Sequence, residues 1–250
     1  MFNSLVDSAR NIFNIQKSKE NNEVVCENII EVEKVLNSRS THNLILYIKP
    51  SRLKMHGGLS YDLSHPFLQA MRDGKSALMQ FYQNFQPKNL AEMYSLVKIS
   101  LSGEDLPPWV LPWMPEKINY APTEEEGLSL SHGVSFYGPA SLEKMDLEYT
   151  RLKSIEKSIN EKGYDTKIGG HISGWFMQSG DDFVFFVRGG KHRAAVLTYL
   201  NPEGLIPVIL RQDFPKAFFG EQSPSWDQVK NGSIDEKVAK NIFNCYFKKS

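Results

Sequence analysis

One stretch of the chain reads Phe185-Phe186-Val187-Arg188-Gly189-Gly190-Lys191-His192-Arg193-Ala194-Ala195-Val196-Leu197, and it passes from apolar residues through a glycine pair into a cationic run. The apolar run Phe183–Val187 has the length and aromatic content of a buried strand. A glycine pair allows a sharp turn, because glycine adopts backbone conformations that other residues avoid. The stretch therefore predicts a strand, a tight turn and a helix over Lys191–Leu200.

The first turn of this predicted helix carries Lys191, His192 and Arg193. Acidic side chains are normally favoured there, because the helix dipole is positive at that end and the first N–H groups lack partners. Cations at this position, following two glycines, favour a site for an anion such as phosphate. In the alternative interpretation, Arg193 pairs with a carboxylate and His192 packs in the core.

The residues on either side predict a small α/β unit over residues 134–212. Ser141 is a suitable N-cap, and Gly163 is a natural end for the helix that follows it. The expected order is strand, helix, strand, strand, helix, strand. The expected strands are Val134–Tyr137, Ile168–Met177, Asp182–Val187 and Ile206–Leu210.

The preceding residues predict a mainly helical N-terminal extension over residues 1–102, with a Pro- and Trp-rich connector over 103–133. Helices are expected at Phe2–Ile15 and Val24–Leu36, and a strand at Leu44–Ile48. A further helix is expected from Pro66 onward, which Asp73-Gly74 can interrupt, and a last one at Ala91–Ile99. Five prolines between Gly103 and Gly127 exclude regular structure there, and Trp109 and Trp113 predict packing onto a neighbour. A helical tail over residues 213–250, with a helix at Val238–Phe247, completes the expected organisation.

Composition narrows the class of protein. The chain has 250 residues, 41% of them hydrophobic, with 29 basic and 29 acidic side chains. A balanced charge argues against a broad nucleic-acid surface. No apolar run approaches the roughly 18 residues that span a membrane, and no secretion signal is evident. Two cysteines are too few for a disulfide framework. We therefore expect a cytoplasmic protein with no nucleic-acid partner and no membrane span.

Four elements, taken in order, resemble the ParB/sulfiredoxin superfamily over roughly residues 134–211. They are the helix Leu152–Gly163, the strand Phe183–Val187, the turn Gly190-Lys191-His192-Arg193-Ala194-Ala195 and the strand Ile206-Pro207-Val208-Ile209. The resemblance implies an α/β fold, a ParB/sulfiredoxin-like mixed sheet with helices, that binds nucleotide phosphates at the glycine turn. The implied nucleotide-binding residues are Gly189, Gly190, Lys191, His192 and Arg193.

Two activities of this superfamily fit the chain poorly. Sulfiredoxins carry a reactive cysteine where this chain has Lys191, so the nucleophile for sulfinic acid repair is missing. ParB proteins continue into a helix-turn-helix region and a dimerisation region, for which residues 212–250 are too few. The small-molecule kinases of the superfamily remain. The resemblance then implies a nucleotide-dependent phosphotransferase that uses ATP or another nucleotide with Mg²⁺.

Such a kinase would act on a small hydroxylated metabolite. The resemblance alone implies that this metabolite belongs to surface polysaccharide biosynthesis. The resemblance implies a catalytic glutamate near the start of the helix before the glycine turn. We favour Glu148 as this glutamate, acting with His192 and Arg193, and Glu143 and Asp146 are alternatives. In the non-catalytic interpretation, Glu148 forms an ion pair with Arg151, three residues later on the same helix. The histidines show no metal-ligand spacing, so the metal ligands stay unknown.

The rival function is a non-catalytic nucleotide sensor or protein-interaction module, whose N-terminal extension binds a protein partner. An acidic group that faces the phosphate-binding turn distinguishes the two functions, because an enzyme needs it and a sensor does not.

Overall fold

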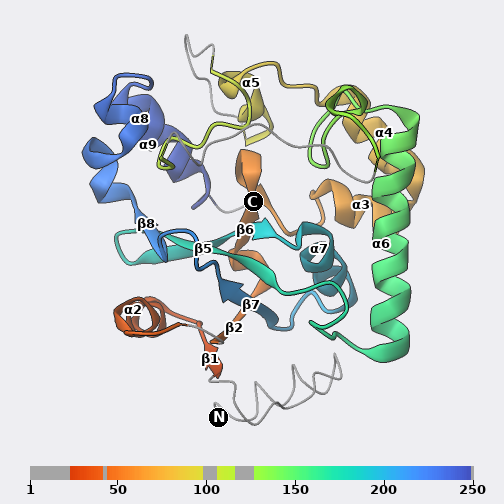
Figure 1. The fold of residues 1–250 in the computed structure, drawn as a ribbon, viewed down its shortest axis with the longest axis horizontal. Helices are drawn as coiled ribbons and strands as arrows, with labels where there is room; N and C mark the ends of the chain where they lie inside the picture. Colours follow the sequence, from red (N-terminus) through yellow and green to blue (C-terminus); the bar gives the residue numbers. More distant parts are fainter. Residues whose placement is uncertain (1–22, 42–43, 98–105, 116–126, 249–250) are drawn as a thin grey trace.

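The computed structural model describes residues 23–41, 44–97, 106–115 and 127–248. These residues form an α/β fold around a mixed sheet of eight strands (Figure 1). The strand order is β1-β2-β7-β5-β6-β3-β4, and β8 pairs with β5 outside this path. The strands are β1 Glu23–Val25, β2 Ile45–Ile48, β3 Leu53–Met55, β4 Leu59–Ser60, β5 Ile172–Ser179, β6 Asp182–Gly189, β7 Ile206–Leu210 and β8 Ala217–Phe219.

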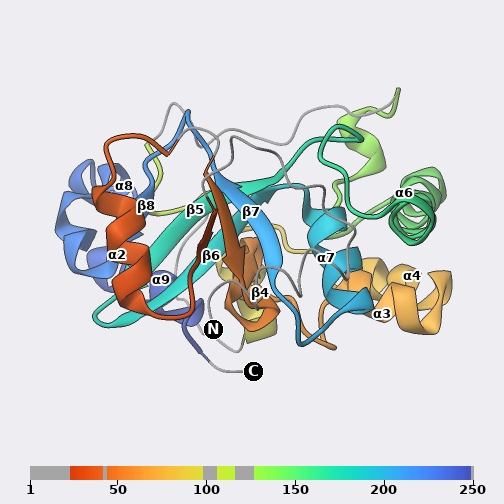
Figure 2. The ribbon, with the colours of Figure 1, turned by 90° about the horizontal axis from the view of Figure 1, so that it is seen from below.

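Helices cover the sheet from two sides. Figure 2 shows α3, α4, α6 and α7 grouped on one side and α2, α8 and α9 on the other. The α-helices are α2 Ile29–Asn37, α3 Pro66–Asp73, α4 Lys75–Asn84, α5 Leu90–Met93, α6 Leu142–Lys162, α7 Lys191–Leu200, α8 Asp227–Lys230 and α9 Glu236–Cys245. Short 3-10 helices lie at η1 Pro50–Arg52, η2 His56–Gly58, η3 Ser95–Val97, η5 Leu130–His132 and η6 Gly220–Ser225.

The predicted strand, turn and helix around the glycine pair are confirmed. Strand β6 ends at Gly189, and Gly190 takes the left-handed conformation with φ 75° and ψ 28° before α7 begins. The limits of α6 are also confirmed. The Ser141 hydroxyl accepts a hydrogen bond from the Lys144 N–H at 3.2 Å, and Gly163 ends the helix with φ 76°.

The prediction of a mainly helical N-terminal extension is wrong for residues 23–60, because this segment supplies four strands to the sheet. Strand β2 pairs antiparallel with β7, and β3 pairs parallel with β6. Only β2 is expected from the sequence. The physical reason is that buried β6 needs hydrogen-bonding neighbours on both sides, and β5 supplies only one of them.

Other predicted elements differ in extent. Val134 and Tyr137 pair with each other in an isolated bridge across a turn, so this segment is a tight turn and not a strand. Helix α2 starts at Ile29 because Asn28 caps it. Gly74 separates α3 from α4, which confirms the expected interruption. The last expected helix stops at Met93 and is followed by η3, while the predicted helix Phe2–Ile15 lies outside the described residues.

Aromatic side chains fill the core between β6 and the C-terminal helices. Trp175 stacks on Phe186 across the β5–β6 pair with ring centroids 4.7 Å apart. Trp113 is 2% exposed and packs edge-on against Phe243, so its predicted burial is confirmed, whereas Trp109 is only partly buried. Within the described parts of the chain, no helix is long and apolar enough to cross a membrane.

Candidate anion-binding site

A hollow of about 500 Å³ lies where β6 passes into α7. Five of its lining side chains are cationic or can become so, and none of the described residues that line it is acidic. The lining residues are Ser135, Arg151, Ile155, Gly169, Arg188, Gly189, Gly190, Lys191, His192 and Arg193. The structure therefore brings together all five residues of the predicted phosphate-binding turn.

Gly190 allows the backbone to fold closely over the neighbouring strand. A Cβ atom at this position would lie 3.0 Å from the Ile172 Cα and 3.2 Å from the His171 carbonyl oxygen. Its left-handed conformation also disfavours side chains. The turn therefore needs glycine, and the first residues of α7, whose N–H groups lack helical partners, line the hollow directly after it.

Arg193 lies against the loop before β5. Its Nη2 donates to the His171 carbonyl oxygen at 3.2 Å, and a Cβ on Gly169 would lie 2.6 Å from its Nη1. Among the described residues its buried Nε–H has no hydrogen-bond partner. Burial, together with the Arg193 charge, lowers the pKa of His171. Arg193 thus holds the loop through its guanidinium group.

Lys191 extends from the same turn toward Phe136. Its ammonium nitrogen lies 4.4 Å from the centroid of the Phe136 ring, which is a cation–π contact. This contact orients a flexible side chain on one wall of the hollow.

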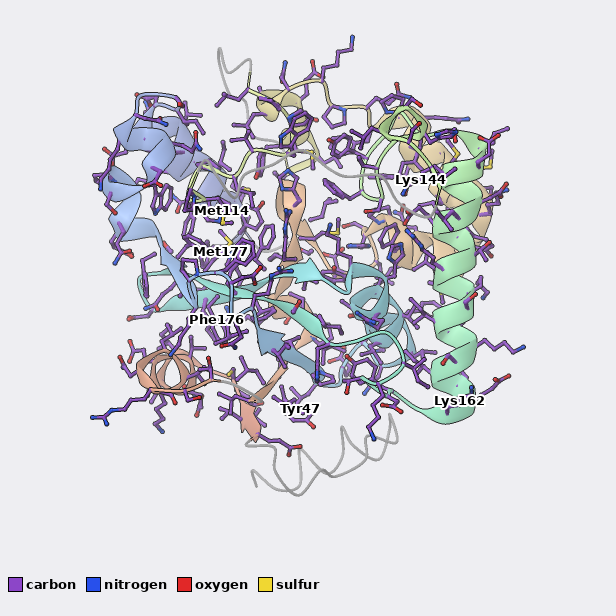
Figure 3. All side chains as sticks on the ribbon, viewed as in Figure 1. Tyr47, Met114, Lys144, Lys162, Phe176 and Met177 are labelled. Carbon is purple, nitrogen blue, oxygen red and sulfur yellow. The ribbon has the colours of Figure 1, made fainter. Side chains whose placement is uncertain are left out.

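Glu148 is fully buried in α6, directly behind two of the lining residues. Its Oε2 contacts the Nε2 of His192, and its Oε1 lies 3.0 Å from the Lys144 Nζ and 3.1 Å from the Arg151 Nη1. Lys144 lies near the end of α6 that is closest to α4 (Figure 3). One carboxylate therefore fixes the positions of three cationic or titratable side chains.

The electrostatics of this cluster keep Glu148 ionised. Burial raises the pKa of the carboxyl group, but the hydrogen bond from His192 and the charges of His192 and Lys144 outweigh it. The net result is a pKa below the usual value, so Glu148 is a carboxylate at neutral pH. Both oxygens have partners, and Glu148 does not line the hollow.

The two alternative carboxylates lie elsewhere. Glu143 is exposed on the first turn of α6, where hydrogen bonds from its own backbone and from Ser141 lower its pKa. Asp146 pairs with Lys75 of α4. Neither residue lines the hollow. The Glu148–Arg151 ion pair that the helical spacing predicts is present.

Phe67 of α3 completes the support for His192. The two rings stack with centroids 4.6 Å apart at 15°. Behind Phe67 lie His65 and Tyr61, whose own rings stack 4.5 Å apart. Sequence reasoning missed Phe67 and Lys144. The spacing of Lys144 four residues before Glu148 could have identified the ion pair, whereas no sequence signal points to Phe67.

The remaining histidines that the structure describes do not gather around a metal. Within the described ranges, no group of three or more His, Cys, Asp or Glu side chains could hold a metal ion. His65 caps α3 by accepting from the Phe67 N–H at 3.1 Å, and His132 contacts Ser129.

Comparison with protein-family models, with curated proteins and with solved structures finds no match to this chain. The resemblance to the ParB/sulfiredoxin superfamily therefore rests on its motif residues alone, and the observed geometry is that of a cationic hollow at a strand–glycine–helix turn.

Proposed function

We propose that this protein binds a nucleotide through its phosphate groups in the cationic hollow. The observation that carries the proposal is the convergence of Arg151, Arg188, Lys191, His192 and Arg193 at the N-terminus of α7. Arginine offers paired donors to phosphate oxygens, and free N–H groups at a helix N-terminus add to the attraction. A polyphosphate carries the opposite charge to these side chains and is therefore attracted to them.

The size of the hollow favours a nucleotide over inorganic phosphate. A volume of about 500 Å³ lies within the ordinary range for small-molecule sites. Ile155 and the glycine backbone add apolar and neutral surface beside the cations. The resemblance to the ParB/sulfiredoxin superfamily supports ATP or another nucleotide as the ligand.

Phosphoryl transfer to a small hydroxylated metabolite is the second candidate function. The contact between Glu148 and His192 at the wall of the hollow favours it. A carboxylate that holds one nitrogen of an imidazole leaves the other nitrogen able to accept a proton. In this candidate His192 is the general base, Glu148 is the residue that orients it, and Arg193 contacts the phosphate.

An enzyme would need an acidic group that faces the turn, and this requirement determines which of the two candidate functions we rank first. Glu148 is buried behind His192, and no described lining residue is acidic. The oxygens of Glu148 are already bound by cationic side chains, so this carboxylate does not fit an Mg²⁺ ligand. We therefore rank nucleotide binding first and assign no step to a metal ion.

Calorimetric titration with ATP, ADP and CTP tests the binding proposal. Arg193→Ala is expected to weaken binding by about 1.5–3 kcal/mol, the range for a charge-assisted hydrogen bond. Lys191→Ala should weaken it less, because an ammonium acts as a point charge and is screened by salt. Lys240→Ala, a change on α9 outside the hollow, is the matched control and should leave binding unchanged.

Failure of the wild-type protein to bind any of the three nucleotides at millimolar concentration would reject the proposal and favour a protein-interaction role. If the nucleotides bind, phosphorus NMR of the protein with ATP, Mg²⁺ and a metabolite pool separates the two candidates. New phosphomonoesters that disappear in His192→Asn support phosphotransfer, and bound but unchanged ATP supports a sensor.

A further inference from the structure

A second hollow, of about 570 Å³, lies at the opposite end of β6 from the cationic site. Asp182 and Val184, at the start of β6, line it, whereas Arg188 and Gly189, at the end of the same strand, line the first hollow. Strands β3 and β4 and the C-terminal residues complete the wall. The two sites therefore share a strand, and none of the described residues lines both.

Lys54 is the unusual residue of this second hollow. It lies in the middle of β3, is only 4% exposed, and its amine contacts the hydroxyl of Ser60, its cross-strand neighbour on β4. Fully buried lysines are rare because an ammonium loses its hydration. A second cation of the wall, Arg52, is paired with Asp182 and with the Phe183 carbonyl oxygen.

Burial changes the chemistry of the Lys54 amine. It lowers the pKa of the ammonium, although the charge of Asp62 acts in the opposite direction. A lysine of ordinary pKa is neutral in fewer than about one molecule in a thousand at pH 7. A desolvated lysine at the wall of a hollow is neutral more often, and the neutral amine is the nucleophile that attacks carbonyl carbons.

We propose that the second hollow is a reactive site in which the amine of Lys54 forms an imine with a small hydroxylated aldehyde. The geometry of the wall points to this class of ligand. The hydroxyl groups of Ser51 and Ser60 and the carboxylates of Asp62 and Asp182 make this wall polar, which suits a ligand that carries hydroxyl groups. The proposal is independent of nucleotide binding at the first hollow.

The reaction balances without a further reagent. The lone pair of the Lys54 Nζ forms a bond to the carbonyl carbon, and the carbon–oxygen π pair moves to oxygen. A proton passes from nitrogen to that oxygen, for which the Ser60 hydroxyl in contact with the amine is a suitable relay. The nitrogen lone pair then forms the C=N bond as the C–O bond breaks. The hydroxyl group leaves with the remaining N–H proton as water, so the imine forms and neither the protein nor the aldehyde is oxidised or reduced.

Reductive trapping tests the proposal on the intact chain. The protein is incubated at neutral pH with glyceraldehyde and cyanoborohydride, which converts an imine to a stable secondary amine, and lysine modification is followed by peptide mass spectrometry. We expect the Lys54 peptide to be modified at least about ten times faster than the Lys157 peptide. Lys157 is the internal reference because its side chain is 75% exposed.

Two variants complete the experiment. Lys54→Met should abolish the fast modification, and Lys157→Met should preserve it. The wild-type peptide map decides the question even if Lys54→Met fails to fold. Modification of Lys54 no faster than that of Lys157 would overturn the proposal and leave Lys54 as a structural partner of Ser60. Fast modification that survives Lys54→Met would overturn the assignment to this residue.

Discussion

The carboxylate of Glu148 on α6 contacts the imidazole of His192 on the first turn of α7, and these two residues join the buried core to the cationic hollow. The same carboxylate binds Arg151, a second lining residue. Glu148 thus positions groups that can face a ligand while it is itself removed from the hollow. Its loss should therefore affect the stability of the fold as well as the geometry of the site.

Glu148→Gln should lower the free energy of unfolding by about 3 kcal/mol, because removing one charge of a buried cluster leaves its partners uncompensated. Urea unfolding monitored by circular dichroism measures the change. Glu156→Gln on the same helix is the matched control, since the Lys153 partner of Glu156 is exposed and the expected cost is below about 1 kcal/mol. Equal costs for the two variants would show that the buried cluster does not stabilise the fold.

The contribution of Glu148 to the free energy of unfolding should depend on pH. Its pKa is lowered in the folded protein, so the unfolded chain takes up a proton first as the pH falls. The stabilisation is therefore complete above the unfolded pKa of about 4.3 and is lost as the pH falls through the folded pKa. The difference in unfolding free energy between wild type and Glu148→Gln should be constant above about pH 5 and shrink below about pH 4. A difference that grows on acidification would contradict this assignment.

His65 predicts a second acid effect, at higher pH. Burial lowers its pKa to about 3, whereas an unfolded histidine titrates near about 6.5. Between these values the unfolded chain holds a proton that the folded chain lacks, so stability falls on acidification by about 1.4 kcal/mol per pH unit. His65→Asn keeps a side-chain cap for α3 and removes the titrating group.

The measurement is the urea midpoint of both proteins between pH 6.5 and pH 4.5. We expect the pH dependence to be shallower in His65→Asn by about the contribution of one histidine. His56, whose pKa burial also lowers to about 3, remains in the variant and keeps some of the dependence. Parallel curves for the two proteins would exclude a neutral, buried His65.

Substitutions at two glycines with positive φ can distinguish the cost of backbone strain from the cost of steric crowding. Gly180 has φ 56° and open space where a Cβ atom would lie, whereas Gly190 is crowded by Ile172 and His171. Gly180→Ala should cost about 1 kcal/mol of stability from the left-handed backbone alone. Gly190→Ala should cost at least about 2 kcal/mol and also weaken nucleotide binding, because the turn must shift. Similar effects of both changes would show that close approach at Gly190 is unimportant.

The sequence predicts those turns and helix ends that depend on residues within a few positions of one another. The glycine pair before Lys191, the cap at Ser141 and the stop at Gly163 all act within a few residues, and all three are found. The strands β1, β3 and β4 are two or three residues long, too short for a recognisable alternation. Their existence depends on pairing with distant strands, which a single sequence does not reveal.

The candidate site likewise combines features that local sequence signals predict with contacts between distant residues that they do not predict. The cationic turn is predictable because its residues are consecutive, and the Glu148–Arg151 pair because three residues separate them on one helix. The contact of Glu148 with His192 joins positions 44 residues apart and depends on how α6 packs on α7. That Glu148 is the base stays a prediction. Its carboxylate is also bound by Lys144 and Arg151, which suits it to orient His192.

Calorimetric titration of the wild-type protein with tripolyphosphate, and separately with adenosine, tests most directly whether the hollow recognises phosphate groups. The cationic lining predicts that tripolyphosphate binds at or below millimolar concentration, that added salt weakens its binding, and that adenosine does not bind over the same range. Binding of adenosine without binding of tripolyphosphate, or unchanged tripolyphosphate affinity in Arg193→Ala, would contradict phosphate recognition by this hollow.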